Sequence, residues 1–498
     1  MSISVRKQAL FVFSGQALAA VGQAIIPMLL SRHFSKIEFG TYQQFTTLMQ
    51  TILPIITFGL NTSLLFFFPR AEGPKKNRIV IQTQLLLWGL GCCGMLTLLI
   101  FQPFFPTMLT PIQGCPNILP FCTLVGVAAG IMDVIFIVEK RVQCSLWIPA
   151  LEQITKAGLV CIGGWITQNA YGAACGLTAF YALRCLAATG YVWARYAPKL
   201  ASWLRNRQPI LPLTDLKPIV AYVAPFGASI SIRTIGQRVD RLLSISMLTQ
   251  TQFAVYSVAF STVPIFGLFL DSVFRVSVPR LSSLELCGNP STLRTAWKNM
   301  VSATLSMAIP LVVFAFFFAE EIITILFTES FLAAVPVYRI YLAITFVTAF
   351  GPGLILRALH KTSKSFVANS IGALTSAAMA YPMIHTFGMI GAVWTAVTAT
   401  MLPSVIQLEF ERRAMRASFS EWLPWRSLAV QFLLSGVLAG LVKFMLGGGW
   451  HPLFIILASF ILFMLLYGTI ALTCRIGYWA EYTERVKSFV FKPLRPLS

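Results

Sequence analysis

Residues 453–474 read LFIILASFILFMLLYGTIALTC and contain no charged side chain. Residues 79–101, IVIQTQLLLWGLGCCGMLTLLIF, form a second uncharged run of similar length. A helix of about twenty apolar residues spans the hydrocarbon core of a bilayer, whereas the strands of a membrane barrel alternate apolar and polar residues over shorter segments. The two runs therefore predict transmembrane α-helices.

The composition extends this prediction to most of the chain. Of the 498 residues, 57% are hydrophobic and only 11% are charged, and the mean hydropathy is +0.75. A soluble domain needs more polar surface than that. The net charge of +21 fits cytoplasmic loops that face anionic lipid headgroups, so we expect no nucleic-acid partner. The ten cysteines and four histidines form no metal-binding pattern, and we expect neither a metal nor a cofactor.

Hydropathy predicts an all-α integral membrane protein with about fourteen transmembrane helices. We expect an N-terminal six-helix lobe at 1–200, a cytoplasmic linker at 201–218, a C-terminal six-helix lobe at 219–426, two additional helices at 427–474 and a cytoplasmic tail at 475–498. The spans are expected near residues 9–30, 42–68, 79–101, 117–138, 148–167, 172–194, 219–248, 253–275, 300–319, 335–357, 366–385, 389–409, 427–447 and 452–474.

The distribution of lysine and arginine gives the orientation of these spans. With the N-terminus inside, 29 of the 38 lysines and arginines fall on the inner side. The outer loops carry only Arg32, Lys36 and Lys443. Because cytoplasmic loops of membrane proteins are enriched in these residues, the pattern predicts a multi-pass protein of the bacterial inner membrane with both termini in the cytoplasm.

Two pairs of similar segments indicate an internal repeat. The segment EFGTY (38–42) is similar to QFAVY (252–256), which begins 214 residues later, and AYGAA (170–174) is similar to MIGAV (389–393), 219 residues later. Since six predicted helices separate the members of each pair, the two halves share one membrane orientation. The chain therefore predicts two pseudo-symmetric lobes that form a parallel repeat.

Apart from the cations already counted on the inner and outer sides, six fall inside the predicted spans, where each costs roughly 2.5–3.5 kcal/mol at a helix centre. Such residues face a wet cavity or carry partners. They are Lys156, Arg184, Arg233, Arg238, Arg241 and Arg339.

Two of the cations leave more than one interpretation open. Glu152 precedes Lys156 by four residues, the order that favours an ion pair on one helix, so Lys156 is either neutralised there or a cavity ligand. Arg339 lies within a turn of the outer surface, where its long side chain can reach the headgroups. Arg184 is central in the sixth span and has no acid three or four residues away, which favours a place in the cavity.

The seventh span carries three arginines and one acid. On a continuous helix Arg233, Gln237 and Asp240 lie within about 60° of one another, and Arg241 lies about 80° from Arg233. One acid cannot neutralise three arginines, so the span carries surplus positive charge. Such a cavity selects an anion, and guanidinium suits phosphate. We predict a cavity for a diphosphate or anionic glycan, with Asp240 as the candidate for ion coupling and these ligands: Arg233, Arg241, Arg238, Arg184 and Lys156.

Several segments resemble those of a known family. VDRLL (239–243), AVYSVA (254–259) and VPRLS (278–282), with LSR (30–32) and EFGTY (38–42) in the first half, are similar to the polysaccharide-transport family of Wzx-type O-antigen flippases. That family belongs to the MOP superfamily, with MATE exporters and lipid II flippases. The resemblance covers almost the whole chain in span number and order, and it implies a MATE-like fold with a central cationic cavity.

The resemblance also implies a function. Such a flippase translocates an undecaprenyl-diphosphate-linked oligosaccharide, an O-antigen unit of lipopolysaccharide or a related repeat, across the inner membrane by alternating access coupled to an ion gradient. The implied partners are that glycan, the phospholipid bilayer, a polysaccharide polymerase and the chain-length machinery. A lipid II flippase and a MATE-type multidrug exporter stay open as alternatives, although cationic drugs would require acids in the cavity. An enzyme is not expected, because the chain has no GxxxxGK[ST] loop and no cluster of histidines.

Overall fold

The computed structural model describes residues 22, 24–112, 114–139, 141–196, 213–262, 270, 274, 290–359, 361–418, 422–423, 425–446 and 452–473. All regular structure among these residues is helical, as predicted. The first predicted span up to residue 21, most of the eighth after Thr262, residues 201–212 of the linker, the VPRLS segment and the tail lie outside the described residues.

The chain forms two compact units. Unit 1 contains Met1–Ser257 and Ala373–Ala396, and unit 2 contains Val258–Gly372 and Val397–Ser498. The two six-helix lobes, divided at the 201–218 linker, stay a prediction. Unit 1 contains residues Ala373–Ala396 of α19 (Thr362–Ala414) and these helices: α2 (Lys36–Thr57), α3 (Leu60–Arg70), α4 (Pro74–Phe101), α5 (Pro106–Leu109), α6 (Ile118–Ala128), η1 (Ala129–Ile131), α7 (Met132–Val138), α8 (Val142–Thr167), α9 (Ala170–Tyr196), α11 (Leu213–Gly236), α12 (Val239–Met247) and most of α13 (Gln250–Thr262).

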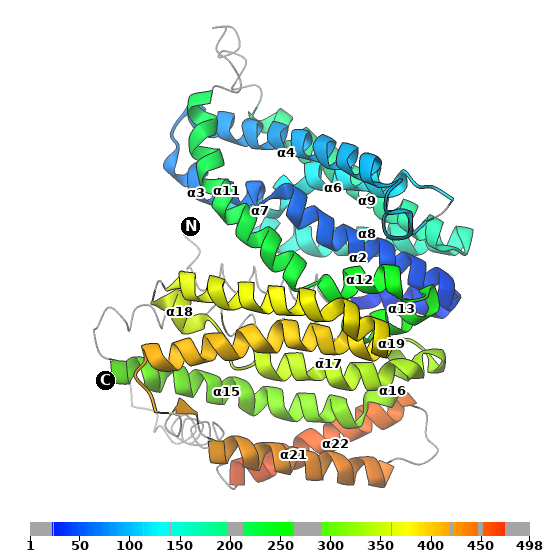
Figure 1. Cartoon of the computed structure of the whole chain (residues 1–498), viewed down its shortest axis with the longest axis vertical. Coiled ribbons are helices and arrows are strands. Elements are labelled where there is room, and N and C mark those ends of the chain that lie inside the picture. The colour runs from blue at the N-terminus through cyan, green and yellow to red at the C-terminus, as the bar shows by residue number, and fades with distance from the viewer. Residues whose placement is uncertain are drawn as a thin grey trace, which may run out of the picture. The chain divides into compact units, whose positions relative to one another are not determined.

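Unit 2 is built around α15 (Pro290–Phe317). Helices α17 (Val335–Thr348) and α21 (Trp425–Leu446) pack against α15, and α22 (Pro452–Thr473) packs against α21 (Figure 1). The two helices predicted as an addition after the second lobe are therefore α21 and α22, and they belong to the packed core of this unit. The remaining elements of unit 2 are α16 (Ala319–Leu326), η2 (Glu329–Ala334), α18 (Leu354–Ala358) and parts of α19 (Thr362–Ala414).

The structure confirms a membrane-spanning helical fold. Eight described helices are long and apolar enough to cross a bilayer, or nine if the bent pair α2 and α3 counts as one span. This count takes helix α19 as one span, although α19 covers two of the predicted spans. The number fourteen stays a prediction, because the first span and most of the eighth lie outside the described residues.

Helix α19 is a hairpin rather than one rod. Its backbone leaves the helical region at Gly388, where φ is 55° and ψ is −128°, a conformation that only glycine adopts easily. The amide of Gln407 donates to the amide oxygen of Asn369 over 2.9 Å, and these two residues lie equally far from the turn in sequence. The two halves, coloured yellow and orange in Figure 1, therefore run antiparallel and match the predicted spans at 366–385 and 389–409.

Four of the predicted spans are interrupted among the described residues: α2–α3, α6–η1–α7, α11–α12 and α17–α18. Broken helices free backbone groups that lipid cannot satisfy, so protein groups must do so. At the break between α6 and α7, the amide of Gln84 donates to the carbonyl of Ala128 over 3.0 Å, and that of Asn61 to Gly130 over 3.2 Å. Side-chain amides inside unit 1 thus make this break tolerable at membrane depth.

The two members of the first repeat pair contact each other. An ideal Cβ on Gly40 would lie 2.1 Å from the carbonyl oxygen of Gln250 and 3.2 Å from the Cβ of Ala254. Gly40 and Ala254 occupy the same position in EFGTY and QFAVY. Both segments begin a helix after a hydroxyl residue, Ser35 for α2 and Thr249 for α13. The similarity noted in the sequence therefore corresponds to a close contact within unit 1.

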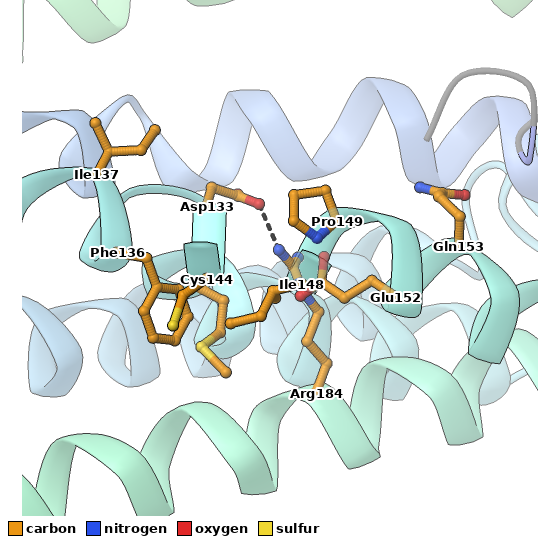
Figure 2. Close-up of a pocket in the computed structure, with 10 residues that line it drawn as sticks. Asp133, Phe136, Ile137, Cys144, Ile148, Pro149, Glu152, Gln153 and Arg184 are labelled. Atoms are coloured by element: carbon orange, nitrogen blue, oxygen red, sulfur yellow. Dashed lines mark hydrogen bonds and ion pairs between the residues drawn. The ribbon is translucent and has the colours of Figure 1, made fainter. Parts of the chain in front are cut away.

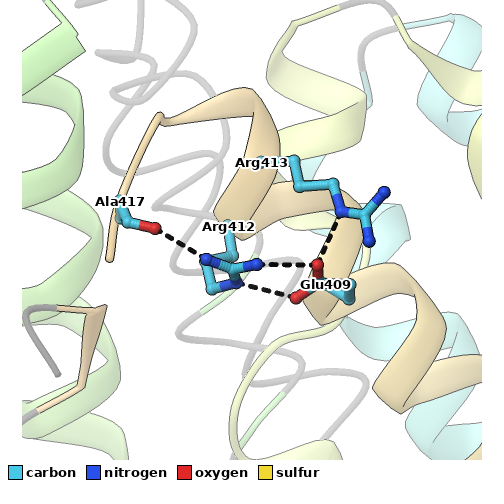
Figure 3. A network of polar contacts seen from close by, with 4 residues as sticks. All are labelled: Glu409, Arg412, Arg413 and Ala417. Carbon is cyan, nitrogen blue, oxygen red and sulfur yellow. Dashed lines mark hydrogen bonds and ion pairs between the residues drawn. The ribbon is translucent and has the colours of Figure 1, made fainter. Parts of the chain in front are cut away.

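The core of unit 2 contains stacked aromatic rings, and ion pairs join charged residues near the ends of its helices. The rings of Trp297 and Trp422 stack with centroids 5.6 Å apart. Near the end of α19, Glu409 accepts hydrogen bonds from Arg412 over 2.7 and 2.8 Å and from Arg413 over 2.6 Å (Figure 3). At the other side of the unit, Arg339 pairs with Glu320 over 3.2 Å.

Candidate functional site

A polar cavity of about 300 Å³ lies in unit 1 between α7, α8 and α9. Its wall combines an arginine, two acids and a glutamine with apolar side chains (Figure 2). The charged residues lie on three separate helices, so only the packing of the unit brings them together. The lining residues are Met132, Asp133, Phe136, Ile137, Cys144, Ile148, Pro149, Glu152, Gln153 and Arg184.

Arg184 of α9 is the centre of this site. Its Nε donates to Glu152 of α8 over 2.7 Å, and its Nη2 donates to Asp133 of α7. The side chain of Arg184 is 13% exposed, against 22% for Glu152 and 51% for Asp133. Arg184 therefore does line a cavity, but two carboxylates accompany it.

The partners of Arg184 could not be predicted from the sequence. The search for an acid three or four residues away covers only the residue's own helix, whereas both acids come from neighbouring helices. Asp133 and Glu152 were visible as acids within spans, yet no pattern in the sequence joins them to Arg184. Two carboxylates balance the charge of Arg184 in this cavity, and its role as a substrate ligand stays a prediction.

Lys156 lies one turn after Glu152 on α8 and is half-buried. The ion pair that the sequence allowed between them is replaced, in the described part of the chain, by the bond from Glu152 to Arg184. Together Asp133, Glu152, Lys156 and Arg184 carry no net formal charge. Arg184 can bind an anion only when its bonds to Asp133 and Glu152 rearrange.

The seventh predicted span is broken, which corrects the helical-wheel argument. Helix α11 ends at Gly236 and α12 begins at Val239, and the turn between them contains Gln237 and Arg238. The angular separations expected between Arg233 and the residues after the break do not hold, because they assume one continuous helix.

The three arginines of this segment have different surroundings. Arg233, in the last turn of α11, is exposed and forms no ion pair among the described residues. Arg238 donates to the side-chain oxygen of Gln50 on α2 over 3.3 Å. Arg241 is 19% exposed in its side chain and lies 3.9 Å from the carboxylate of Asp240. The predicted span at 219–248 thus holds three arginines against one acid, Asp240.

Asp240 is the buried member of this group, with 1% of its surface exposed. Its Oδ2 accepts a hydrogen bond from the hydroxyl of Tyr256 on α13, and its Oδ1 has no hydrogen-bond partner within the described part of the chain. Tyr256 belongs to the QFAVY segment, so the repeat segment also holds the candidate coupling acid. Sequence reasoning missed Tyr256, since only the fold shows that α13 returns against the start of α12.

The structure places the five predicted ligands in two groups within unit 1. Arg184 and Lys156 belong to the charge-balanced cluster of α7, α8 and α9, and Arg233, Arg238 and Arg241 belong to the α11–α12 segment. The surplus of positive charge therefore comes from α11 and α12. Within the described residues no three His, Cys, Asp or Glu side chains gather in a way that could hold a metal ion.

The fold belongs to a known class of membrane proteins. A lipid II flippase, MurJ, in an inward closed conformation, matches with a TM-score of 0.71 and 14% identity over 93% of this chain and 98% of that one. An inward-facing multidrug resistance MATE transporter of the MOP superfamily matches with a TM-score of 0.56 and 13% identity, over 84% and 96%. A MOP superfamily transporter from Pyrococcus furiosus gives 0.53 and 13%, over 82% and 94%. At such identities the matches establish the MOP fold.

The sequence also matches a family. Residues 29–336 match the family described as polysaccharide biosynthesis protein, and the chain belongs to that family. Residues 288–420 match a second family, described as a protein of unknown function. No curated protein matches the sequence. Family and fold together confirm the resemblance to polysaccharide flippases of the MOP superfamily.

Proposed function

We propose that the protein translocates an undecaprenyl-diphosphate-linked oligosaccharide, an O-antigen unit or a related polysaccharide repeat, across the bacterial inner membrane by alternating access. Membership of the polysaccharide biosynthesis family supports the substrate class. The lipid tail stays in the bilayer while the diphosphate and the sugars pass through the protein. Both termini are cytoplasmic in this proposal, and a polysaccharide polymerase with its chain-length machinery receives the product.

The observation that carries the proposal is the surplus of arginine on α11 and α12. Three arginines accompany one buried acid there, and Arg233 forms no ion pair among the described residues. A hydrogen bond to a charged group contributes about 1.5–3 kcal/mol, or roughly 10- to 150-fold in binding. Arg233, Arg238 and Arg241 are the proposed ligands of the diphosphate. Arg184 and Lys156 are ligands that become available when the pairs around Arg184 exchange.

Coupling to an ion gradient is part of the proposal, and Asp240 is its candidate in unit 1. The Oδ1 atom, which has no hydrogen-bond partner among the described residues, would accept a proton or a cation. When neither is bound, the hydroxyl of Tyr256 and the nearby Arg241 stabilise the ionised carboxylate. An ionised Asp240 attracts Arg241 and so competes with the substrate for it, whereas a neutral Asp240 does not.

Charge reversal tests the proposal. Arg233→Glu and Arg241→Glu should each abolish surface polysaccharide in a cell whose own flippase is deleted, while the protein stays in the membrane. Lys217→Glu is the matched control, because Lys217 is exposed at the start of the same helix α11 and the change in charge is equal. Normal surface glycan in both arginine variants would show that the cationic mechanism is wrong.

The same cells separate the alternatives. Complementation of a strain that lacks its lipid II flippase, with no effect on surface polysaccharide, would favour the lipid II alternative. Resistance to cationic drugs without either effect would favour a multidrug exporter.

A further inference from the structure

Glu411 is a buried acid that the proposed path through unit 1 does not use. It lies on the second half of α19 in unit 2, and none of its surface is exposed. Leu408 and Met415, one turn before and after it on the same face of the helix, belong to the buried apolar cluster of the unit. A carboxyl group in such a place needs compensation for the water that it has lost.

The carboxyl group contacts the discontinuity between α17 and α18. The N–H of Ile355 donates to its Oε1 over 2.8 Å. Ile355 follows a loop in which Gly351 and Gly353 have φ values of 66° and 82°. The other oxygen, Oε2, is buried and has no hydrogen-bond partner among the residues that the structure describes. Glu411 therefore satisfies the backbone at the break with one oxygen and leaves the second one unused.

An ionised carboxylate is poorly compensated here. One N–H bond to Oε1 does not replace the hydration of Oε2, and burying an unpaired charge costs several kcal/mol. The charged group that acts on Glu411 from a neighbouring element is Arg357 of α18, whose side chain is exposed and screened by water. On its own helix, the guanidinium groups of Arg412 and Arg413 are held by Glu409.

Asp240 in unit 1 is also a buried acid, but its charged form is better compensated than that of Glu411. That carboxylate also has one unpartnered oxygen, but a tyrosine hydroxyl donates to the other and an arginine lies 3.9 Å away. Glu411 has neutral backbone N–H groups in those places: that of Ile355 bonds to Oε1, and those of Leu356 and Gly353 act on the carboxyl group from the same turn. Of the two buried acids, Glu411 is the one for which a proton on the unpartnered oxygen best removes the cost of burial.

We propose that Glu411 is a proton-binding site of unit 2, with its carboxyl group neutral and the proton on Oε2 while α18 packs against it. On release, the O–H bond breaks, the proton passes to water and the carboxylate keeps the electron pair. The charge then requires water or Arg357 at Oε2, which the packed break between α17 and α18 does not provide. Proton release therefore favours a different arrangement of this break.

This site deepens the proposed function, on which its role in transport rests, by naming a carrier for the coupling ion in unit 2. Its protonation can be tested without transport. Infrared spectra of the full-length protein in lipid bilayers at neutral pH report the C=O stretch of a protonated carboxyl group. Glu411→Gln should remove one such band, because the amide keeps an oxygen for the N–H of Ile355 and loses only the ionisable group.

Glu409→Gln is the matched control for the infrared experiment. Glu409 lies two residues away on the same helix and is held in its ionised form by Arg412 and Arg413, so its replacement should leave the band unchanged. Loss of the band in Glu409→Gln, or its persistence in Glu411→Gln, would overturn the assignment. Absence of any protonated carboxyl band in the unmodified protein would overturn it as well.

The role in transport is tested with a polyprenyl-diphosphate-linked disaccharide in proteoliposomes. Glu411→Gln should equilibrate the probe between leaflets without a gradient but lose the acceleration that a proton gradient gives the unmodified protein. Equal acceleration in Glu411→Gln would refute the coupling role. Failure of the unmodified protein to move the probe would instead refute the proposed function, and the infrared comparison would still decide the state of Glu411.

Discussion

Replacement of Arg184 by glutamine removes a guanidinium that two carboxylates share. The pair with Glu152 is mostly buried, with side-chain exposures of 13% and 22%, so its rupture falls in the range of about 3–5 kcal/mol for a buried pair left with an uncompensated charge. The pair with Asp133, which is 51% exposed, adds at most about 1 kcal/mol. Since glutamine can still donate one hydrogen bond, we expect Arg184→Gln to lower the free energy of unfolding by about 3 kcal/mol.

The measurement is reversible unfolding in mixed micelles of lipid and dodecyl sulfate, followed by circular dichroism. Arg195→Gln serves as the control. Arg195 lies on the same helix α9 and pairs with Glu139 over 3.1 Å, but its side chain is 47% exposed and Glu139 keeps the hydroxyl of Tyr191 as a donor. The control should cost no more than about 1 kcal/mol.

A double variant tests the cause. Glu152→Gln in the Arg184→Gln background removes the stranded carboxylate, so the two costs should fall short of additivity by about 1–3 kcal/mol. If the costs add, or if Arg184→Gln is no worse than Arg195→Gln, the charge-balanced cluster is not a stabilising feature and the reasoning on this site is wrong.

Two further predictions concern packing and orientation. Gly40→Ala should destabilise the protein by about 1–3 kcal/mol in the same assay, because the new Cβ would lie 2.1 Å from the carbonyl oxygen of Gln250. The control Gly89→Ala should be neutral or stabilising, since its Cβ would have nothing within 4 Å. Equal effects of the two substitutions would refute the contact. In a cysteine-free background, Glu72→Cys and Ser418→Cys should react with a membrane-impermeant thiol reagent only from the cytoplasmic side, and Glu329→Cys only from the outside. Labelling of Glu72→Cys or Ser418→Cys from the periplasm would overturn the orientation.

Much of the fold could be predicted from the chain alone, since hydropathy is local. Apolar runs of about twenty residues identified α4, α15, α21 and α22 without knowledge of their neighbours. The turn at Gly388 was also visible, because two apolar runs meet there with a gap too short for anything but a hairpin. The breaks within α6–η1–α7, α11–α12 and α17–α18 were not, because hydropathy predicts one span at each of these places and does not show where a helix is interrupted. Those breaks depend on side chains from other helices, such as Gln84 and Glu411, that satisfy the freed backbone groups.

The features of the candidate site likewise fall into those that could be predicted from the chain alone and those that only the fold shows. The sequence by itself predicted which cations lie within spans and that the span at 219–248 carries more of them than one acid can balance, since this is a count along one segment. Only the tertiary structure decided that Arg184 meets Asp133 and Glu152, that Tyr256 bonds to Asp240 and that Glu411 keeps one oxygen unused. Electrostatic energy depends on distances between charges, and around Arg184 the short distances join residues on three different helices that lie far apart in the chain.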